Sequence, residues 1–315
     1  MASIVSYRST SIQTDRGCEV FSVAFSSDGK KLISGSSDAT VYIWNADETR
    51  SSFQREQPLI GHESSIFSIA ISPDGKHIIS ASKDDTLRLW DIEKRTQVGG
   101  PWEGHTGAVN CVAFSIDGMH VVSGSDDRTI RLWDVKTGKQ IGESLTGHQA
   151  GIQSIAYVPD GTLVVSGSDD HTIRIWDVER GLQVGVPLEG HTGDVLSIAF
   201  SPNGKRILSG SRDMTIRIWD VDTHRQIGPR IPARASVMSI CSSPDEKLLF
   251  FGTDDNTVWI WDAETGKQMG ERLRGHIRAV ECVACAPDGK SIVSASLDGT
   301  IRIWNIETHV AWSKL

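Results

Sequence analysis

Seven tryptophans, each followed by Asp or Asn, recur along this 315-residue chain at nearly constant spacing. The intervals between them are 46, 43, 43, 43, 42 and 43 residues. The text before each tryptophan also repeats, as in Ser125–Asp134 and, further upstream, in Gly104-His105 and Val109–Phe114. Self-similarity of this kind identifies a repeat architecture. Residues 1–315 are therefore predicted to form a single domain of seven units, centred on Trp44, Trp90, Trp133, Trp176, Trp219, Trp261 and Trp304.

Each unit is predicted to consist of β-strands. Its apolar runs are short, rich in β-branched residues and interrupted by residue pairs that favour tight hairpin turns. Helices have almost no room between these turns. Although length alone would suggest about two domains, large all-β rings are commonly this long. The turn pairs are Asp28-Gly29, Asp74-Gly75, Asp117-Gly118, Asp160-Gly161, Asn203-Gly204 and Asp288-Gly289.

A period in the forties that carries Gly-His and Trp-Asp signatures resembles WD-repeat propellers, and the resemblance covers essentially the whole chain. It implies an all-β, seven-bladed β-propeller with four antiparallel strands in each blade. Such rings usually hide their last sheet edge by adding the N-terminal strand to the final blade. Ser3–Ile12 has a suitable length for this strand, and His309–Leu315 is the alternative candidate for the same outer place.

The resemblance also implies a hydrogen-bonded set in each blade, which we call the clasp: the His of Gly-His, a Ser on the second strand, the Asp of the tight turn, and the Trp. Ser, His and Asp also compose a hydrolase triad. Repetition favours the structural interpretation, because an enzyme needs one nucleophile in one cleft and this set occurs five times at equivalent places. The complete clasps are His62, Ser80, Asp84, Trp90; His105, Ser123, Asp127, Trp133; His148, Ser166, Asp170, Trp176; His191, Ser209, Asp213, Trp219; and His276, Ser294, Asp298, Trp304.

Two blades depart from this pattern. In blade one, Asp15-Arg16 stand where Gly-His is expected. In blade six, Pro232-Ala233 replace Gly-His, Phe251 replaces the Ser, and Glu246 replaces the turn glycine. We expect these two blades to be the least rigid, or to be held by apolar packing instead.

Three further motifs suggest chemistry that their context does not support. Gly289-Lys290-Ser291 ends like a phosphate-binding loop, but Ala284 stands where the first glycine is needed. Cys282 and Cys285 have a CxxC spacing, but residues i and i+3 of a strand point to opposite faces. Five blades carry an arginine two residues before the tryptophan, where we expect packing and pairing between blades. No metal or cofactor is expected. The arginines are Arg88, Arg131, Arg174, Arg217 and Arg302.

The charge and cysteine content limit the classes of partner. With 32 basic and 40 acidic residues, the net charge of -8 repels a phosphate backbone, so nucleic-acid binding by non-specific charge is not expected. Five cysteines at irregular positions favour reduced thiols, and hence an intracellular location in the cytoplasm or nucleus. Met1–Gln13 is polar and Ser-rich without an apolar core of signal-peptide length, and nowhere do eighteen apolar residues run together, so neither secretion nor a membrane partner is expected. No small-molecule substrate is evident.

In propellers of this family, partners usually contact the face that bears the Gly-His loops and the clasp turns. Three positions in each blade flank the first-strand Val or Ile or precede the clasp Asp; we call them the mouth positions, because we expect them to ring the channel mouth. They vary while the framework repeats, as expected where no common packing task exists. They are Glu19, Phe21, Ser37; Ser65, Phe67, Lys83; Ala108, Asn110, Asp126; Gly151, Gln153, Asp169; Asp194, Leu196, Arg212; Ser236, Met238, Asp254; and Ala279, Glu281, Leu297.

The mouth positions favour a basic and apolar protein or peptide partner. Phe21 with Phe67, and Leu196 with Met238, form two apolar sectors that suit protein recognition. An acidic sector in blades three and four lies between them, and we expect exposure of the two phenylalanines to contribute nothing to the fold. Six acidic residues stand against Lys83 and Arg212: Glu19, Asp126, Asp169, Asp194, Asp254 and Glu281.

These features predict a non-enzymatic interaction scaffold. The near-identical Thr137–Gly142 and Thr265–Gly270 resemble long WD arrays of fungal proteins, in some of which the array is the sensor region of a signalling protein with a nucleotide-binding (NACHT-type) switch. A sensor domain of that kind, a structural subunit of a larger complex, and a histone-tail reader are alternatives. The fold also resembles G-protein β subunits, but Met1–Arg16 shows no coiled-coil heptads. An enzyme would need a convergent acid and base pair outside the clasps.

Overall fold

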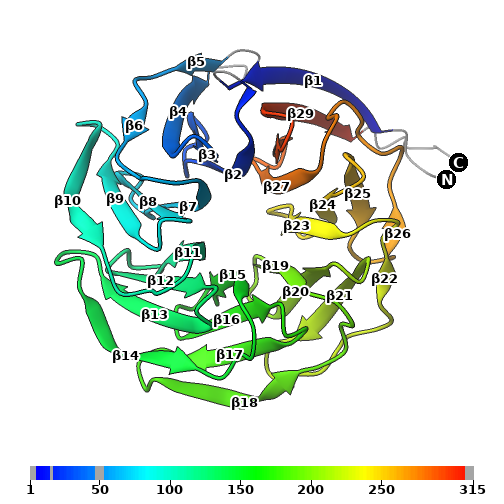
Figure 1. Cartoon of the computed structure of the whole chain (residues 1–315). Helices are drawn as coiled ribbons and strands as arrows, with labels where there is room; N and C mark the ends of the chain where they lie inside the picture. Colours follow the sequence, from blue (N-terminus) through cyan, green and yellow to red (C-terminus); the bar gives the residue numbers. More distant parts are fainter. Residues whose placement is uncertain (1–4, 15–16, 47–52, 309–315) are drawn as a thin grey trace, which may run out of the picture.

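The computed structural model describes residues 5–14, 17–46 and 53–308. Within these ranges the chain forms seven antiparallel sheets around a central channel (Figure 1). No α-helix occurs in the part of the chain so described. The seven-bladed, all-β propeller predicted from the repeat is therefore confirmed.

The first two strands of each blade lie nearest the channel. The inner strands are β2 (Val20–Phe25), β7 (Ile66–Ile71), β11 (Val109–Phe114), β15 (Ile152–Tyr157), β19 (Val195–Phe200), β23 (Val237–Ser242) and β27 (Val280–Cys285). The second strands are β3 (Lys31–Ser36), β8 (His77–Ser82), β12 (His120–Ser125), β16 (Leu163–Ser168), β20 (Arg206–Ser211), β24 (Leu248–Thr253) and β28 (Ser291–Ser296).

The third and outer strands complete the blades. The third strands are β4 (Thr40–Ala46), β9 (Leu87–Asp91), β13 (Thr129–Asp134), β17 (Ile173–Asp177), β21 (Thr215–Asp220), β25 (Val258–Asp262) and β29 (Thr300–Thr308). The outer strands are β5 (Phe53–Arg55) with β6 (Leu59–Ile60), β10 (Thr96–Trp102), β14 (Gln140–Thr146), β18 (Leu182–Leu188), β22 (Ile231–Pro232), β26 (Lys267–Gln268) and, in blade seven, β1 (Val5–Gln13).

The hydrophobic core lies between the blades. Each of the seven clusters of buried apolar side chains joins residues of two adjacent blades. In one of them, Leu87 and Trp102 of blade two pack with Val109 and Val121 of blade three. A single blade therefore has no complete core of its own, which is why the unit must repeat and close.

Close approach of neighbouring blades explains the recurring glycine in the second strand. A Cβ atom built on Gly124 would lie 2.5 Å from Cγ2 of Ile152 in the next blade, closer than such contacts allow. Blades two and seven accommodate only one methyl group at the same place, in the fully buried Ala81 and Ala295. Small residues here let one blade pack on the next.

The predicted hairpin turns form as expected, including the one that lacks glycine. Gly118 has a φ of 71°, in the left-handed region that favours glycine, and Glu246 adopts 61° at the equivalent place in blade six. The carboxylate of Glu246 accepts hydrogen bonds from the backbone N (2.8 Å) and the side-chain Nδ2 (2.7 Å) of Asn203. These two hydrogen bonds link blades five and six, and they offset the backbone strain of a non-glycine residue with a positive φ.

The N-terminal strand closes the ring. β1 pairs antiparallel with β29, with Gln13 opposite Thr300 and Val5 opposite Thr308 (Figure 1). The predicted N-terminal closure is confirmed for Val5–Ile12, while Ser3 and Ile4 lie outside the described residues. The alternative segment, His309–Leu315, also lies outside them.

Candidate functional site

The five predicted clasps form with nearly identical geometry. Nδ1 of each histidine lies 2.7–3.0 Å from the clasp Asp Oδ2, and Nε2 lies 2.7–2.8 Å from the Ser Oγ. The tryptophan Nε1–H donates to the same Oγ over 2.8–2.9 Å. These bonds are all satisfied when the histidine is neutral and donates from Nδ1. In blade seven, burial lowers the pKa of His276 despite the Asp298 carboxylate beside it, which keeps this ring neutral.

The sequence analysis did not include a fifth member of the clasp, a threonine two residues after the aspartate. In blade three, Thr129 Oγ1 donates to Asp127 Oδ1 at 2.7 Å, while the backbone N of Thr106 donates to Oδ2 at 3.1 Å. The recurrence of this threonine in the repeat was the signal that could have identified it. It is Thr86, Thr129, Thr172, Thr215 and Thr300.

The clasps are structural and do not act as nucleophilic triads. All five clasp serines are fully buried, with 0% of their surface exposed, so no substrate carbonyl can reach their Oγ atoms. Each hydroxyl is also already engaged by both the tryptophan and the histidine, as Ser123 is by Trp133 and His105. The five sets therefore contribute hydrogen bonds to the fold.

The clasp carboxylates are held ionised. Burial alone would raise the pKa of Asp127, but hydrogen bonds from His105 and Thr129 outweigh it and hold the pKa below the ordinary value of 3.8. Because the pKa is lower in the folded state, the stability that this carboxylate contributes is present at neutral pH. It is lost as the pH falls below 3.8 toward the folded-state pKa.

We expect Asp127→Ala to lower the free energy of unfolding by about 1–3 kcal/mol, because it leaves the buried His105 and the Thr129 hydroxyl without their acceptor. His105→Ala should have a similar effect through Asp127. Thermal unfolding measures both. Asp126→Ala, which removes the neighbouring exposed carboxylate, is the matched control and should leave the melting temperature nearly unchanged. A melting temperature equal to wild type for Asp127→Ala would contradict the clasp assignment in that blade.

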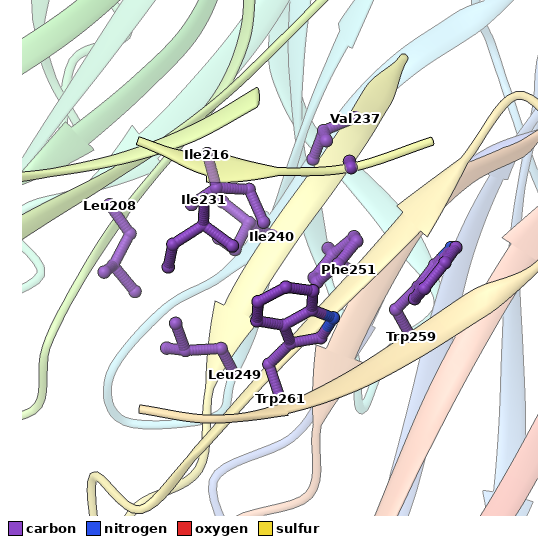
Figure 2. Packing of buried hydrophobic residues seen from close by; sticks show 10 residues of the cluster. Leu208, Ile216, Ile231, Val237, Ile240, Leu249, Phe251, Trp259 and Trp261 are labelled. Carbon is purple, nitrogen blue, oxygen red and sulfur yellow. The ribbon is translucent and has the colours of Figure 1, made fainter. Parts of the chain in front are cut away.

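Blade six replaces its clasp by aromatic packing. This is the second of the two alternatives that the sequence left open for this blade. Phe251, at the clasp serine position, stacks on Trp259 with ring centroids 5.8 Å apart and lies 6.1 Å from Trp261 (Figure 2). Trp261 Nε1 has no hydrogen-bond partner in the described part of the chain, because the serine that accepts this bond in the complete blades is replaced by Phe251. The guanidinium of Arg272 covers the Trp259 ring at 4.7 Å and bonds to Asp255 at 3.0 Å.

Blade one keeps part of its clasp. Trp44 Nε1 donates to Ser34 Oγ at 3.1 Å, and the Tyr42 hydroxyl donates to Asp38 Oδ2 at 2.6 Å. Tyr42 stands where most blades have the arginine that precedes the tryptophan. Asp15-Arg16, which replace Gly-His, lie outside the described residues.

The prediction that the recurring arginines pair between blades is wrong, because they bond within their own blade. Arg88 NH1 donates to Gln97 Oε1 of the outer strand at 2.6 Å, and Gln97 Nε2 donates to the carbonyl of Gly99 at 3.1 Å. Arg131, Arg174 and Arg217 bond in the same way to Gln140, Gln183 and Gln226. Arg302, whose blade has β1 as its outer strand, lies over the Trp304 ring at 5.9 Å.

The phosphate-loop-like and CxxC motifs lie at the turn and on the strand faces that the sequence predicted. Gly289 lies in the hairpin turn between β27 and β28, where its N–H donates to the carbonyl of Ala286. Cys282 packs against the cluster between blades seven and one, and Cys285 against the cluster between blades six and seven. Cys111, Cys241, Cys282 and Cys285 form no disulfide.

One mouth position of each blade converges on the channel. The side chains of these seven residues line a hollow of about 250 Å³: Phe21, Phe67, Asn110, Gln153, Leu196, Met238 and Glu281. The other two positions of every blade are joined by a backbone hydrogen bond, as Asp126 N–H donates to the carbonyl of Ala108 at 3.0 Å. None of the 21 residues is buried. The structure thus brings seven of the 21 mouth positions together in one hollow.

Two carboxylates face each other across the junction of blades three and four. A Cβ atom on Gly151 would lie 2.8 Å from Oδ1 of Asp126 and 3.2 Å from Oδ2 of Asp169, so glycine keeps the space between them open. Asn110 Nδ2 donates to Asp126 at 2.6 Å, and Gln153 Nε2 donates to Asp169 at 2.8 Å. Burial, together with the Asp194 and Asp126 charges, raises the pKa of Asp169.

Glu281 is the most perturbed acid of the mouth. Burial, with additional repulsion from Glu19 and Asp254, raises its pKa to about 7, against the ordinary 4.5. Its carboxylate makes no hydrogen bond or ion pair within residues 5–14, 17–46 and 53–308. The protein thus holds a partly buried acid that has no partner of its own.

The charge balance of the mouth is less acidic than the sequence indicated. Asp194 pairs with Arg212 at 3.2 Å, and Glu19 pairs with Arg278 at 2.7 Å. The sequence analysis missed Arg278, although the repeat could have identified it. The other complete blades have a small residue at that place, for example Gly107 in blade three. The acids left without a basic partner in the described structure are Asp126, Asp169, Asp254 and Glu281.

The expectation that Phe21 and Phe67 have no structural role is also wrong. Their rings meet edge to face, with centroids 5.1 Å apart. Such a pair contributes about 0.5–1.5 kcal/mol beyond its buried area. Both side chains nevertheless remain partly exposed in the channel, where they form one apolar wall of the hollow.

Seven blades, clasps and a variable channel mouth define a repeat propeller. The family model described as WD domain, G-beta repeat matches seven times, at residues 9–45, 53–91, 96–134, 138–177, 182–220, 230–262 and 266–305. The chain belongs to the WD40 repeat family. A comparison with curated proteins finds no match.

Two searches of the described structure gave negative results. In residues 5–14, 17–46 and 53–308, no three His, Cys, Asp or Glu side chains are grouped so that they could hold a metal ion. Over the same residues, no helix has the length and apolar character that crossing a membrane requires.

Proposed function

We propose that this WD40 propeller is a protein-interaction module that binds a basic and apolar segment of a protein partner at its channel mouth. One observation carries the proposal: seven side chains of six different types, one from each blade, converge on a single hollow of about 250 Å³. The clasps and the strands around them repeat from blade to blade because they hold the fold together. Variation concentrated at an accessible place is typical of a recognition surface.

The chemistry of the hollow favours a cationic side chain. Blade seven adjoins blade one, so Glu281 and Phe21 line neighbouring parts of the wall. A lysine or arginine of the partner placed here would meet an unpaired carboxylate and an aromatic face, which both attract a cation. Leu196 on blade five and Met238 on blade six, which adjoins blade seven on its other side, would contact apolar atoms of the same segment.

An affinity purification with the intact chain as bait tests this function, with the Phe21→Ala/Phe67→Ala variant as the comparison. Proteins that bind the wild type and not the variant are candidate partners. If the variant captured the same proteins with equal yield, the channel mouth would not be the binding site.

For an identified partner, we expect Phe21→Ala/Phe67→Ala to weaken binding at least tenfold, because each ring can bury apolar surface worth about 1.5–3 kcal/mol and a tenfold change needs only about 1.4 kcal/mol. Calorimetric titration measures the change. Loss of the edge-to-face contact should also lower the melting temperature slightly, so unfolding is recorded in parallel. Ile277→Ala is the control, since Ile277 is 78% exposed and lies outside the hollow.

A further inference from the structure

Exposed apolar side chains concentrate on blades three and four. Ile116 is 61% exposed and Met119 63% exposed in the turn between β11 and β12, and Leu182 is 61% exposed at the start of β18. Val186, further along β18, is 75% exposed. Exposure of large apolar side chains to water is unfavourable, and a concentration of them on two adjacent blades is typical of an interaction surface.

Comparison with the other blades shows that the fold does not need these residues. The place of Ile116 is held by proline in blades two, four, five, six and seven, as by Pro73. The place of Met119 is held by lysine in five blades and by Thr162 in blade four, and that of Leu182 by Thr96, lysine or arginine. The same backbone therefore forms elsewhere with polar residues or proline at these places.

Met119 lies in the same turn as Ile116, and Ile116 lines a groove between the two blades. It has a volume of about 730 Å³ and lies at the end of the inner strands that carries the Asp-Gly turns, away from the channel mouth. Leu182 pairs with Asp177, which also lines the groove. The apolar lining comprises Ile116, Leu132, Ile141, Tyr157, Leu163 and Val178.

The charges around this groove are mainly negative. Asp117, Asp160, Asp177 and Glu179 line it, against Arg180 and His120. The Arg180 guanidinium is already directed to Asp177, with Nε 3.6 Å from Oδ2. Hydrogen bonds lower the pKa of Asp117, first from Ser115, and that of Asp160, from the backbone and hydroxyl of Thr162, so both stay ionised.

The corresponding grooves at other blade junctions differ. Between blades one and two, the lining is charged and internally paired, with the Glu56 carboxylate 2.9 Å from Lys31 Nζ and 3.0 Å from Arg95 Nε. Between blades five and six, the Glu246 carboxylate is occupied by Asn203. The groove between blades three and four has exposed apolar side chains beside it and is lined by more carboxylates than basic groups.

We propose that this surface is a second docking site, which binds a basic amphipathic segment of a protein partner through the apolar residues Ile116, Met119 and Leu182 and the acids around the groove. Charge complementarity selects the occupant. A segment with apolar residues on one side and lysines or arginines on the other would cover the apolar groups and neutralise the carboxylates together. The site is separate from the channel mouth and does not depend on the function proposed for it.

The test uses the full chain and a fluorescently labelled synthetic peptide with leucines on one helical face and lysines on the other, with binding measured by fluorescence anisotropy. In the variant Ile116→Pro/Met119→Thr/Leu182→Thr, each new residue is one that another blade carries at the same place, which favours correct folding. We expect this variant to bind the peptide at least tenfold more weakly than wild type. Phe21→Ala/Phe67→Ala should bind it as well as wild type does.

Two further measurements separate charge from apolar contact. A peptide with glutamate in place of lysine should not bind, and Asp160→Asn/Glu179→Gln should weaken binding of the lysine peptide and reduce its salt dependence. Ile60→Thr/Ile277→Thr removes two residues that are 75% and 78% exposed elsewhere and should have no effect. Equal affinity of the triple variant, binding of the glutamate peptide, or a loss confined to Phe21→Ala/Phe67→Ala would each overturn the proposal.

Discussion

Deleting residues 1–12 should abolish the single cooperative unfolding transition and cause the protein to aggregate. β1 supplies the outer strand of blade seven and pairs with all nine residues of β29. Without it, the backbone N–H and C=O groups along the outer edge of Thr300–Thr308 lose their partners and become a template for pairing with other chains. Ile12, which packs against the cluster between blades seven and one, is lost as well.

Size-exclusion chromatography and calorimetry measure this effect. Deleting residues 1–4 leaves β1 whole and is the matched control, which should stay monodisperse and unfold in one transition. Adding a synthetic peptide of residues 1–13 to the truncated protein should restore solubility by supplying the missing strand in trans. A soluble truncated protein with one sharp transition would show that closure does not depend on the N-terminal strand.

Glu281→Gln should stabilise the protein at pH 8 and weaken its binding to a basic partner at the same pH. The pKa of Glu281 is about 7 in the folded protein, against an ordinary value of 4.5, so the folded state binds its proton more tightly. Stability is therefore lost as the pH rises from 4.5 to 7 and the buried acid ionises. At about 1.36 kcal/mol for each pKa unit, the cost approaches about 3 kcal/mol at pH 8, as an upper bound.

Chemical denaturation at several pH values measures this dependence. The gain in stability of Glu281→Gln over wild type should be small at pH 5 and should grow to its full value by pH 8. Glu271→Gln, which changes an exposed acid of blade six, should show no such trend. If the stability difference between Glu281→Gln and wild type did not change with pH, ionisation of Glu281 would not destabilise the folded state.

Binding gives the second half of this prediction. A cationic side chain in the hollow needs the ionised acid, so affinity for a basic partner should rise between pH 6 and pH 8 in the wild type and stay flat in Glu281→Gln. A residue that lowers stability and raises affinity is typical of a recognition site, because function and stability compete for it. Equal pH dependence of binding in the two proteins would place the cation elsewhere.

The repeat determined most of the fold before any coordinates. A period of about 43 residues places equivalent residues at equivalent sites, so one blade predicts the others. The family resemblance implied the clasp of His105, Ser123, Asp127 and Trp133, and the period then located its four copies and the 21 mouth positions. The departures of blade six were also visible, because Phe251 and Glu246 break a pattern that the neighbouring blades keep.

Tertiary structure decided which non-equivalent residues meet. Glu19 and Arg278 are 259 positions apart and bond only because the ring closes. The arginine of each blade was predicted to reach the next blade, yet the bulged outer strand of its own blade presents a glutamine to it, as Gln97 does to Arg88. Periodicity fixes the position of a residue on the backbone of its blade. The contacts made by the charged or aromatic end of its side chain depend on neighbours that do not repeat.

The same distinction applies to the two surfaces. The sequence by itself determined that mouth residues vary from blade to blade, but only the ring brought Phe21 onto Phe67 and left Glu281 partly buried without a partner. Likewise, Ile116 and Leu182 are ordinary apolar residues in a linear reading of blades three and four. Their exposure beside one acidic groove follows from the packing of blade three on blade four, because burial depends on what the neighbouring blade covers.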